Sequence, residues 1–225
     1  ISDVPRLDGK DKKNATSNDI EYHQVPLLDT KKYFWISNTP AEKGAFDNQC
    51  VKCGYNENPI HGASKDKNGI NRSNTETPIR CLKCNELLPR PWVNKDGEYR
   101  LMKGFTSAYR RMKWDLPATA LTTNLSYASS DSKLHPEQNR VLSLYEAFKI
   151  HTISKYDYSW SRADNMRVSD KLIREIIGES IPPFGLEVIL KHLKEIYKEK
   201  NLSLMPLNSQ LKIFKEPKEV YNLVP

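Results

Sequence analysis

The chain has 225 residues and a net charge of +7. Its length is sufficient to bury a core and predicts one compact region plus an inserted module. No apolar run approaches the roughly 18 residues that a membrane-spanning helix needs, so the composition argues against a helical membrane protein. The start holds no signal-like apolar stretch. Because the first residue is Ile1 rather than methionine, we expect a fragment or a processed product.

The basic charge is concentrated in one stretch of the chain. Residues 51–113 carry 13 basic and 6 acidic side chains, whereas the rest of the chain carries 22 of each. A localised basic region is the electrostatic footprint expected of phosphate contacts. A solvated lysine-rich face would give the same count, so the charge alone leaves both interpretations open.

All four cysteines occur in two CxxC pairs, Cys50 with Cys53 and Cys81 with Cys84. Two thiolates spaced in this way can bind one metal ion, and two such pairs complete a tetrahedral site. Gly54 permits the tight turn that the first pair requires. Disulfides or unrelated thiols are the alternatives, but the pairing with no cysteine left over favours zinc. Four thiolates leave no open position for water, so the predicted role of the zinc is structural.

Residues 104–117 interleave aromatic and basic side chains, and the β-branched residues 118–124 that follow predict a strand. Arginines in such a strip can grip phosphates, and short polar side chains can reach a backbone or a base edge. A buried strand edge with incidental surface arginines is the alternative for any single residue. The candidate DNA-contacting residues are Arg110, Arg111, Thr122, Thr123 and Asn124.

A short capped helix is predicted from Ser143 onward, because Glu146 three residues later completes a capping box. The segment also resembles the ninth conserved block of DNA (cytosine-5) methyltransferases. In that family the block's arginine braces the target-recognition domain against the catalytic domain, which implies structural roles for Arg140 and Glu146. The family's usual Leu-Gln after the block is Ile150-His151 here. The block is carried by Arg140, Leu142, Ser143, Glu146 and Ala147.

Two successive helices are predicted, one ending before and one beginning at Pro182-Pro183. Ser169 is a plausible N-cap of the first helix, and Gly178 suits a left-handed residue after its end. Proline opens the second helix, which we expect to be amphipathic and packed on a core. The turn resembles the family's tenth block, which closes over S-adenosylmethionine, with Glu179 in place of the usual Asn. The implied cofactor-binding residues are Gly178, Glu179, Ser180 and Ile181.

Two further stretches resemble the same family. Residues 109–123 resemble the run that leads out of the target-recognition region, and residues 1–7 resemble the stretch after the eighth block. In the family the target-recognition region lies between the eighth and ninth blocks, and the cysteine pairs fall in that interval here. The resemblance therefore implies that Cys50 to about Trp92 belong to the DNA-recognition region or support its structure. The sequence has no Pro-Cys dipeptide, so the catalytic cysteine is expected on another polypeptide or in a missing N-terminal part.

The resemblance implies an α+β fold, in which a target-recognition domain with a small β-rich zinc ribbon precedes helices that pack on a Rossmann-like catalytic domain. We expect a connector at 1–45, the recognition domain at 46–134, a helical segment at 135–200 and an extension at 201–225. The expected function is that of the target-recognition and cofactor-pocket-completing half of a DNA (cytosine-5) methyltransferase of a restriction-modification system.

The expected cofactors are S-adenosylmethionine, in a pocket shared with a catalytic half that carries the Pro-Cys nucleophile, and structural zinc. The expected substrate is duplex DNA. The expected location is the cytoplasm of a prokaryote, in association with the nucleoid. One alternative is a stand-alone zinc-ribbon nucleic-acid-binding protein derived from such an enzyme. Another is an interaction subunit whose ribbon contacts protein.

Overall fold

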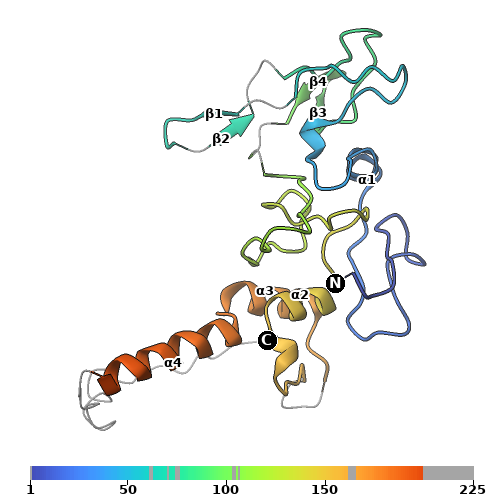
Figure 1. The fold of residues 1–225 in the computed structure, drawn as a ribbon. Coiled ribbons are helices and arrows are strands. Elements are labelled where there is room, and N and C mark those ends of the chain that lie inside the picture. The colour runs from blue at the N-terminus through green and yellow to red at the C-terminus, as the bar shows by residue number, and fades with distance from the viewer. Residues whose placement is uncertain are drawn as a thin grey trace. The chain divides into compact units, whose positions relative to one another are not determined.

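The computed structural model describes residues 2–60, 63–69, 71–73, 77–102, 105, 107–161 and 166–199. The chain divides into two compact units, residues 1–182 and 183–225, and each is considered by itself (Figure 1). Among the described residues the first unit holds three α-helices and two hairpins joined by long loops, and the second holds one α-helix. None of the helices in these ranges is long and apolar enough to cross a membrane.

The first part of the larger unit is mostly loop. Its helix α1 (Thr30–Ser37) begins after Asp29, whose carboxylate accepts a hydrogen bond of 2.8 Å from the Lys32 amide and so satisfies a donor of the first turn. A short 3-10 helix, η1 (Ala45–Asp47), follows and leads directly to the first cysteine pair.

Two antiparallel hairpins lie on either side of the second cysteine pair in the sequence. Their strands are β1 (Ala63–Lys65) with β2 (Asn71–Ser73), and β3 (Trp92–Lys95) with β4 (Glu98–Leu101). Asp96 and Gly97 connect β3 to β4, and both have positive φ angles, as a two-residue hairpin turn with the right twist requires. The region is therefore mixed in structure, with short strands in a largely irregular chain.

The helical part of the larger unit contains α2 (Leu144–Ile150), the 3-10 helix η2 (Ile153–Lys155) and α3 (Asp170–Glu179). The predicted capping box at Ser143 and the predicted N-cap at Ser169 are both confirmed. The prediction for Gly178 is wrong. This glycine lies inside α3 without a positive φ angle, and the helix ends one residue later with Ser180 as its C-cap.

The larger unit is held together by two main hydrophobic clusters. In the first, Trp35 makes edge-to-face contacts with Trp92 and Tyr109, at centroid distances of 5.6 and 5.5 Å. Such contacts add to the free energy gained by removing these large rings from water. In the second, between α2 and α3, Phe148 stacks on Trp160 beside the fully buried Ile173. The first cluster orders the chain around the cysteine pairs, and the second positions the end of α3.

The predicted strand at residues 118–124 is wrong, because this stretch is coil and turn. Two successive reverse turns begin within its last three residues. The Leu125 amide donates to the Thr122 carbonyl at 2.9 Å, and the Tyr127 amide donates to the Asn124 carbonyl at 3.0 Å. The β-branched composition was therefore outweighed by turns that leave no extended edge for a neighbouring strand.

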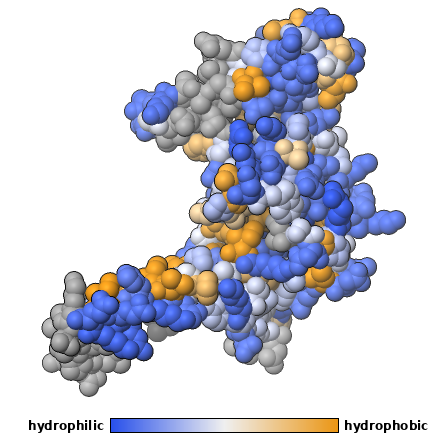
Figure 2. Space-filling model, in the orientation of Figure 1, coloured by the Kyte–Doolittle hydropathy of each residue, from blue (hydrophilic) through white to orange (hydrophobic). Residues whose placement is uncertain are grey.

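The smaller unit is described by α4 (Pro183–Glu199), which begins at the predicted proline. The helix is amphipathic as expected, but none of its residues is buried, so the expected packing on a core is not found within this unit's described part. Figure 2 shows apolar patches along the helix between hydrophilic side chains. The exposed apolar residues are Phe184, Leu186, Val188, Ile189, Leu190, Leu193 and Tyr197.

Candidate metal centre and cofactor turn

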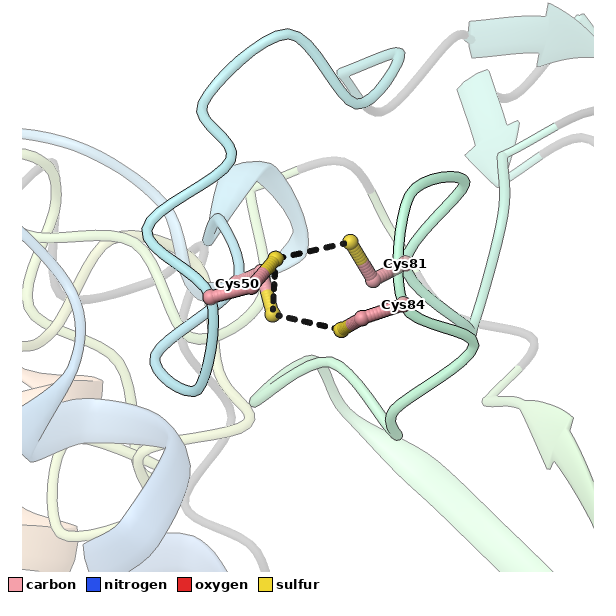
Figure 3. Close-up of side chains that lie close together, drawn as sticks. Cys50, Cys81 and Cys84 are labelled. Carbon is pink, nitrogen blue, oxygen red and sulfur yellow. Dashed lines mark hydrogen bonds between the residues drawn. The ribbon is translucent and has the colours of Figure 1, made fainter.

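The four cysteine thiols converge on one point from two loops (Figure 3). Cys50 Sγ lies 3.5 Å from Cys53 Sγ and 3.6 Å from Cys84 Sγ, and Cys53 Sγ lies 3.7 Å from Cys81 Sγ. Sulfurs placed tetrahedrally about 2.3 Å from a zinc ion are separated by about 3.8 Å. A disulfide would need about 2.05 Å. All four cysteines are thus free thiols, arranged at the spacing of a tetrathiolate metal site.

The two cysteine pairs adopt the same backbone turn. The Cys50 amide donates to the Tyr55 carbonyl at 3.2 Å, and the Cys81 amide donates to the Glu86 carbonyl at 2.8 Å. The residue after each pair has a positive φ angle, 70° at Gly54 and 59° at Asn85. The predicted tight turn at Gly54 is therefore confirmed, and Asn85 serves the second turn because asparagine tolerates this conformation. We call these turns the first and second knuckles.

The knuckle amides also act on the thiols. Hydrogen bonds from the Cys53 and Lys52 amides lower the pKa of Cys50, although burial opposes them. For Cys81, burial works in the opposite direction, but the amides of Cys84 and Lys83 prevail and lower its pKa to about 6. Amide donors stabilise thiolates, which are the form that binds a metal ion. The backbone thus favours the thiolate form of Cys50 and Cys81.

A second polar centre is the ion pair of Arg140 and Glu146, both completely buried. The guanidinium donates two parallel hydrogen bonds to the carboxylate, at 2.6 and 2.7 Å. The Ser143 amide donates to the same carboxylate at 2.8 Å, which completes the capping box. Burial tends to raise the pKa of Glu146, but these hydrogen bonds and the charge of Arg140 outweigh it, so the pKa is lowered.

This centre also ties the N-terminal segment to α2. Arg140 Nε donates to Gln138 Oε1 at 2.8 Å, and the same oxygen accepts a hydrogen bond from the Leu7 amide at 2.8 Å. His23 bridges the segments a second time, because one ring nitrogen lies 2.8 Å from the Pro5 carbonyl and the other 2.9 Å from Ser143 Oγ. Gln138 thus binds Leu7, which lies 131 positions away in the sequence.

His135 is part of the same buried centre, and sequence reasoning assigned it no role. Its Nδ1 accepts hydrogen bonds from the amides of Glu137 and Gln138 at 3.2 and 3.1 Å, which places the proton of the neutral ring on Nε2. Burial and the charge of Arg140 lower the pKa of His135 to about 3. The polar groups around the ring follow closely in the sequence, at Glu137, Gln138 and Arg140, but no sequence pattern indicates that the ring is buried.

The two neighbouring arginines of the basic strip have different environments. Arg111 is 2% exposed, and its guanidinium donates only to acceptors of the protein, at distances of 2.5 to 3.1 Å. The predicted phosphate contact at Arg111 is therefore wrong, because the side chain holds loops together inside the fold. Arg110 is half-buried and lies 3.4 Å from Asp47. The acceptors of Arg111 are Ile36 O, Thr39 O, His135 O, Gln138 O and Asn139 Oδ1.

The three polar candidates that follow lie together on one turn. Thr122 and Asn124 are exposed and help to line an open cavity of about 820 Å³, with Phe105, Tyr127 and Asp131 on its other sides. Thr123 is partly buried. The cavity thus combines aromatic surface with hydroxyl, amide and carboxylate groups at the place where the sequence predicted DNA contacts.

Gly178 lies directly against the backbone of this turn. A Cβ atom added to Gly178 would lie 2.6 Å from Thr123 Cα and closer still to the peptide between Thr122 and Thr123. Real side chains do not approach backbone atoms so closely, so this position requires glycine. The close contact joins the last turn of α3 to the turn that lines the cavity.

The implied cofactor turn follows α3. His151, at the end of α2, lies with Nε2 3.2 Å from Ser180 Oγ and 3.3 Å from the Ser180 carbonyl. Glu179 and Ile181 are exposed, the latter by 64%. The turn therefore has one side anchored to the larger unit, while its carboxylate and its apolar side chain remain accessible. Gly178 belongs to the helix and faces protein, so it supports the turn from behind.

Comparison with known proteins finds distant, partial similarity to type II DNA methyltransferases. The type II methyltransferase M1.HgaI of Avibacterium volantium is 33% identical over 96 residues, which cover 41% of this chain and 27% of that protein. The type II methylase M.HgiDII of Herpetosiphon aurantiacus is 32% identical over 109 residues, which cover 48% and 28%. The chain thus spans little more than a quarter of these relatives. No family model and no solved structure matches significantly.

Proposed function

We propose that the chain is the DNA-recognition and cofactor-pocket-completing part of a DNA (cytosine-5) methyltransferase of a prokaryotic restriction-modification system. The partial similarity to two type II methyltransferases carries this proposal. Residues 46–134 would form the recognition part, and residues 135–200 would complete the methyltransferase domain. The buried pair of Arg140 and Glu146 supports it, because its capping-box geometry suits the bracing role that the ninth-block resemblance implies.

The catalytic cysteine would lie outside these 225 residues. Every cysteine of the chain belongs to the cluster, so none is left to attack cytosine. In this proposal a second polypeptide, or another part of a longer one, supplies the Pro-Cys nucleophile and most of the cofactor site. The present chain would hold the duplex while the target base is turned out of the stack.

The accessible groups of the cofactor turn suit S-adenosylmethionine, which supplies the methyl group when it is bound. Ile181 could pack on the adenine ring, and the carboxylate of Glu179 could accept hydrogen bonds from an ammonium group or ribose hydroxyls. Ser180, held by His151, would fix the path of the turn. An apolar surface next to one acceptor is a usual composition for a nucleoside pocket.

For the metal centre we propose structural zinc. Four thiols at tetrahedral spacing are the ligand set that zinc prefers, and they leave no open coordination position. The ion would order the loops around the knuckles. These loops precede the cavity at Thr122, Asn124 and Tyr127, where duplex DNA would be contacted.

The test is reconstitution with a catalytic part that contains the Pro-Cys motif. Labelled methyl transfer to duplex DNA should require both parts and should vanish when the partner's catalytic cysteine is replaced by alanine. The isolated chain should bind duplex DNA weakly, with an affinity that falls as salt rises, and should not methylate it. Methyl transfer by the isolated chain would overturn the proposal.

The four-cysteine cluster favours one second candidate, a stand-alone zinc-ribbon protein that binds nucleic acid. Copurification separates the two. A stoichiometric partner with a Pro-Cys motif supports the methyltransferase part, whereas its absence from every preparation that retains DNA binding supports the second candidate. DNA affinity that does not respond to salt would argue for a third role, in which the ribbon contacts protein.

A further inference from the structure

We infer that Asn58 is a positioning residue of the metal centre, which joins the two knuckles and donates a hydrogen bond to the thiolate of Cys81. This inference rests on the zinc site of the proposed function. It concerns a residue that the CxxC pattern does not include and that lies eight positions after Cys50.

The burial of Asn58 is unusual for its loop. The residues on either side of it, Glu57 and Pro59, are exposed, whereas Asn58 is only 2% exposed. A buried asparagine is costly unless its donors and acceptors are satisfied. Its contacts therefore indicate what the side chain does.

The side-chain amide of Asn58 spans the gap to the second knuckle. Its Oδ1 accepts a hydrogen bond of 2.9 Å from the Leu82 amide, which is the residue after the ligand Cys81. Because an amide proton can point only at the oxygen, this contact fixes the orientation of the side chain. The nitrogen Nδ2 must then face Cys81 Sγ, at 3.9 Å, and it also lies 3.3 Å from the Tyr55 carbonyl.

The backbone of Asn58 is fixed to the first knuckle in turn. Its amide donates to Gln49 Oε1 at 3.0 Å, and its carbonyl accepts from Gln49 Nε2 at 3.2 Å. Gln49 immediately precedes the ligand Cys50. This two-bond ring closes the loop of the first knuckle, so the Asn58 side chain is presented to the second knuckle from a rigid base.

The two knuckles differ in this respect. They share the pattern of hydrophobic residue and lysine between their cysteines, but the position eight residues after Cys81 is Pro89, which has no side-chain donor. Cys81 thus receives a side-chain N–H in addition to its knuckle amides. Four thiolates around a divalent cation carry a net negative charge, and each added donor spreads it. We therefore expect Cys81 to be the most protected ligand.

The experiment compares Asn58→Asp with the matched variant Asn56→Asp, which introduces the same charge at an exposed position of the same loop. Aspartate keeps an acceptor for the Leu82 amide but replaces the N–H with an anionic oxygen beside the thiolate. Zinc content is measured first in the unaltered protein, and zinc affinity is then measured for all three by competition with a chromogenic chelator. Loss of the hydrogen bond from Asn58 to Cys81 should weaken zinc binding about 10- to 100-fold in Asn58→Asp, whereas Asn56→Asp should weaken it less than about 2-fold.

A second readout separates hydrogen bonding from general loosening of the fold. The zinc-loaded proteins are treated with an alkylating reagent, and the modified cysteines are identified by mass spectrometry. Cys81 should be alkylated last in the unaltered protein and should lose this protection selectively in Asn58→Asp and in the milder Asn58→Ser. Equal acceleration at all four cysteines, or unchanged zinc affinity, would overturn the role of Asn58. Absence of zinc from the unaltered protein would instead overturn the zinc site itself.

Discussion

The four-cysteine cluster is partly buried and the Arg140–Glu146 centre is completely buried, and the two balance their charge in different ways. In the ion pair, the guanidinium and the carboxylate neutralise each other at 2.6 and 2.7 Å. The cluster brings four thiols together, and the negative charge that they carry as metal-binding thiolates can be balanced only by an added cation. One centre is complete within the chain, whereas the other should depend on a metal ion. The first two of the following predictions test that difference directly.

The largest effect is expected from loss of the metal. Replacing the ligand in Cys81→Ser should abolish zinc binding and unfold the loops around both knuckles, because zinc contributes on the order of 10 kcal/mol to such sites. The exposed, non-ligating Lys83→Ser in the same knuckle is the control and should retain one zinc per chain. Hydrogen exchange should rise at residues 48–60 and 78–90 and stay unchanged in α2. Protection of the knuckles without metal would contradict a metal-dependent cluster.

The ion pair should respond to substitution whether or not metal is present. Arg140→Met leaves Glu146 buried without a partner, so the free energy of unfolding should fall by about 3 to 5 kcal/mol in a denaturant titration. Adding Glu146→Leu should restore much of that loss, since neither charge then remains buried. Lys191→Met, which breaks the exposed pair with Glu187 in α4, should change the free energy of unfolding by less than about 1 kcal/mol. Similar losses from both pairs would show that burial does not matter here.

A smaller loss is expected at the contact between α3 and the turn at Thr122. Gly178→Ala introduces a methyl group where backbone already lies, so the free energy of unfolding should fall by about 1 to 3 kcal/mol. Gly185→Ala, at an exposed position of α4, is the control and should be neutral or stabilising because alanine favours helices. Thermal unfolding checks both variants. An unchanged melting temperature for Gly178→Ala would mean that the turn moves aside at little cost.

The smallest effect near neutral pH is expected from His135. Its folded-state pKa of about 3 lies below the unfolded value of about 6.5, so the unfolded chain binds a proton first as the pH falls. This histidine should therefore destabilise the fold as the pH drops below about 6.5, by less than about 1 kcal/mol between pH 7 and 6. The lowered pKa of Glu146 acts in the same direction at lower pH. His135→Gln should flatten the measured dependence of stability on pH above about pH 5.

Much of the candidate site could be predicted because its signals are local. The four clustered cysteines follow from two CxxC spacings, and the cap of α2 follows from Ser143 and Glu146 three residues apart. The start of α4 at Pro183 is likewise predicted by a local signal, the proline itself. Each knuckle and each cap is formed within one turn of the chain, whereas the meeting of the two knuckles joins residues 34 positions apart.

The errors arose where distant segments decide the environment. Arg110 and Arg111 look alike in the sequence, yet the acceptors of Arg111 come from residues as far as 75 positions away. Asn56 and Asn58 are equally alike, and only the approach of the second knuckle makes Asn58 a buried donor. Such contacts cannot be inferred from a local sequence pattern.

Gly178 shows the difference between local sequence signals and contacts with distant segments at a single residue. A glycine near a helix end predicts a left-handed cap, but its real constraint is the peptide of Thr122 and Thr123 pressed against it from another part of the chain. The sequence by itself therefore determined the two cysteine pairs, the N-caps of α2 and α3 and the proline start of α4, since each depends on neighbours in the chain. Only the tertiary structure decided which arginine is buried, which asparagine reaches a thiol and why residue 178 must be glycine, because burial and contact depend on residues far apart in sequence.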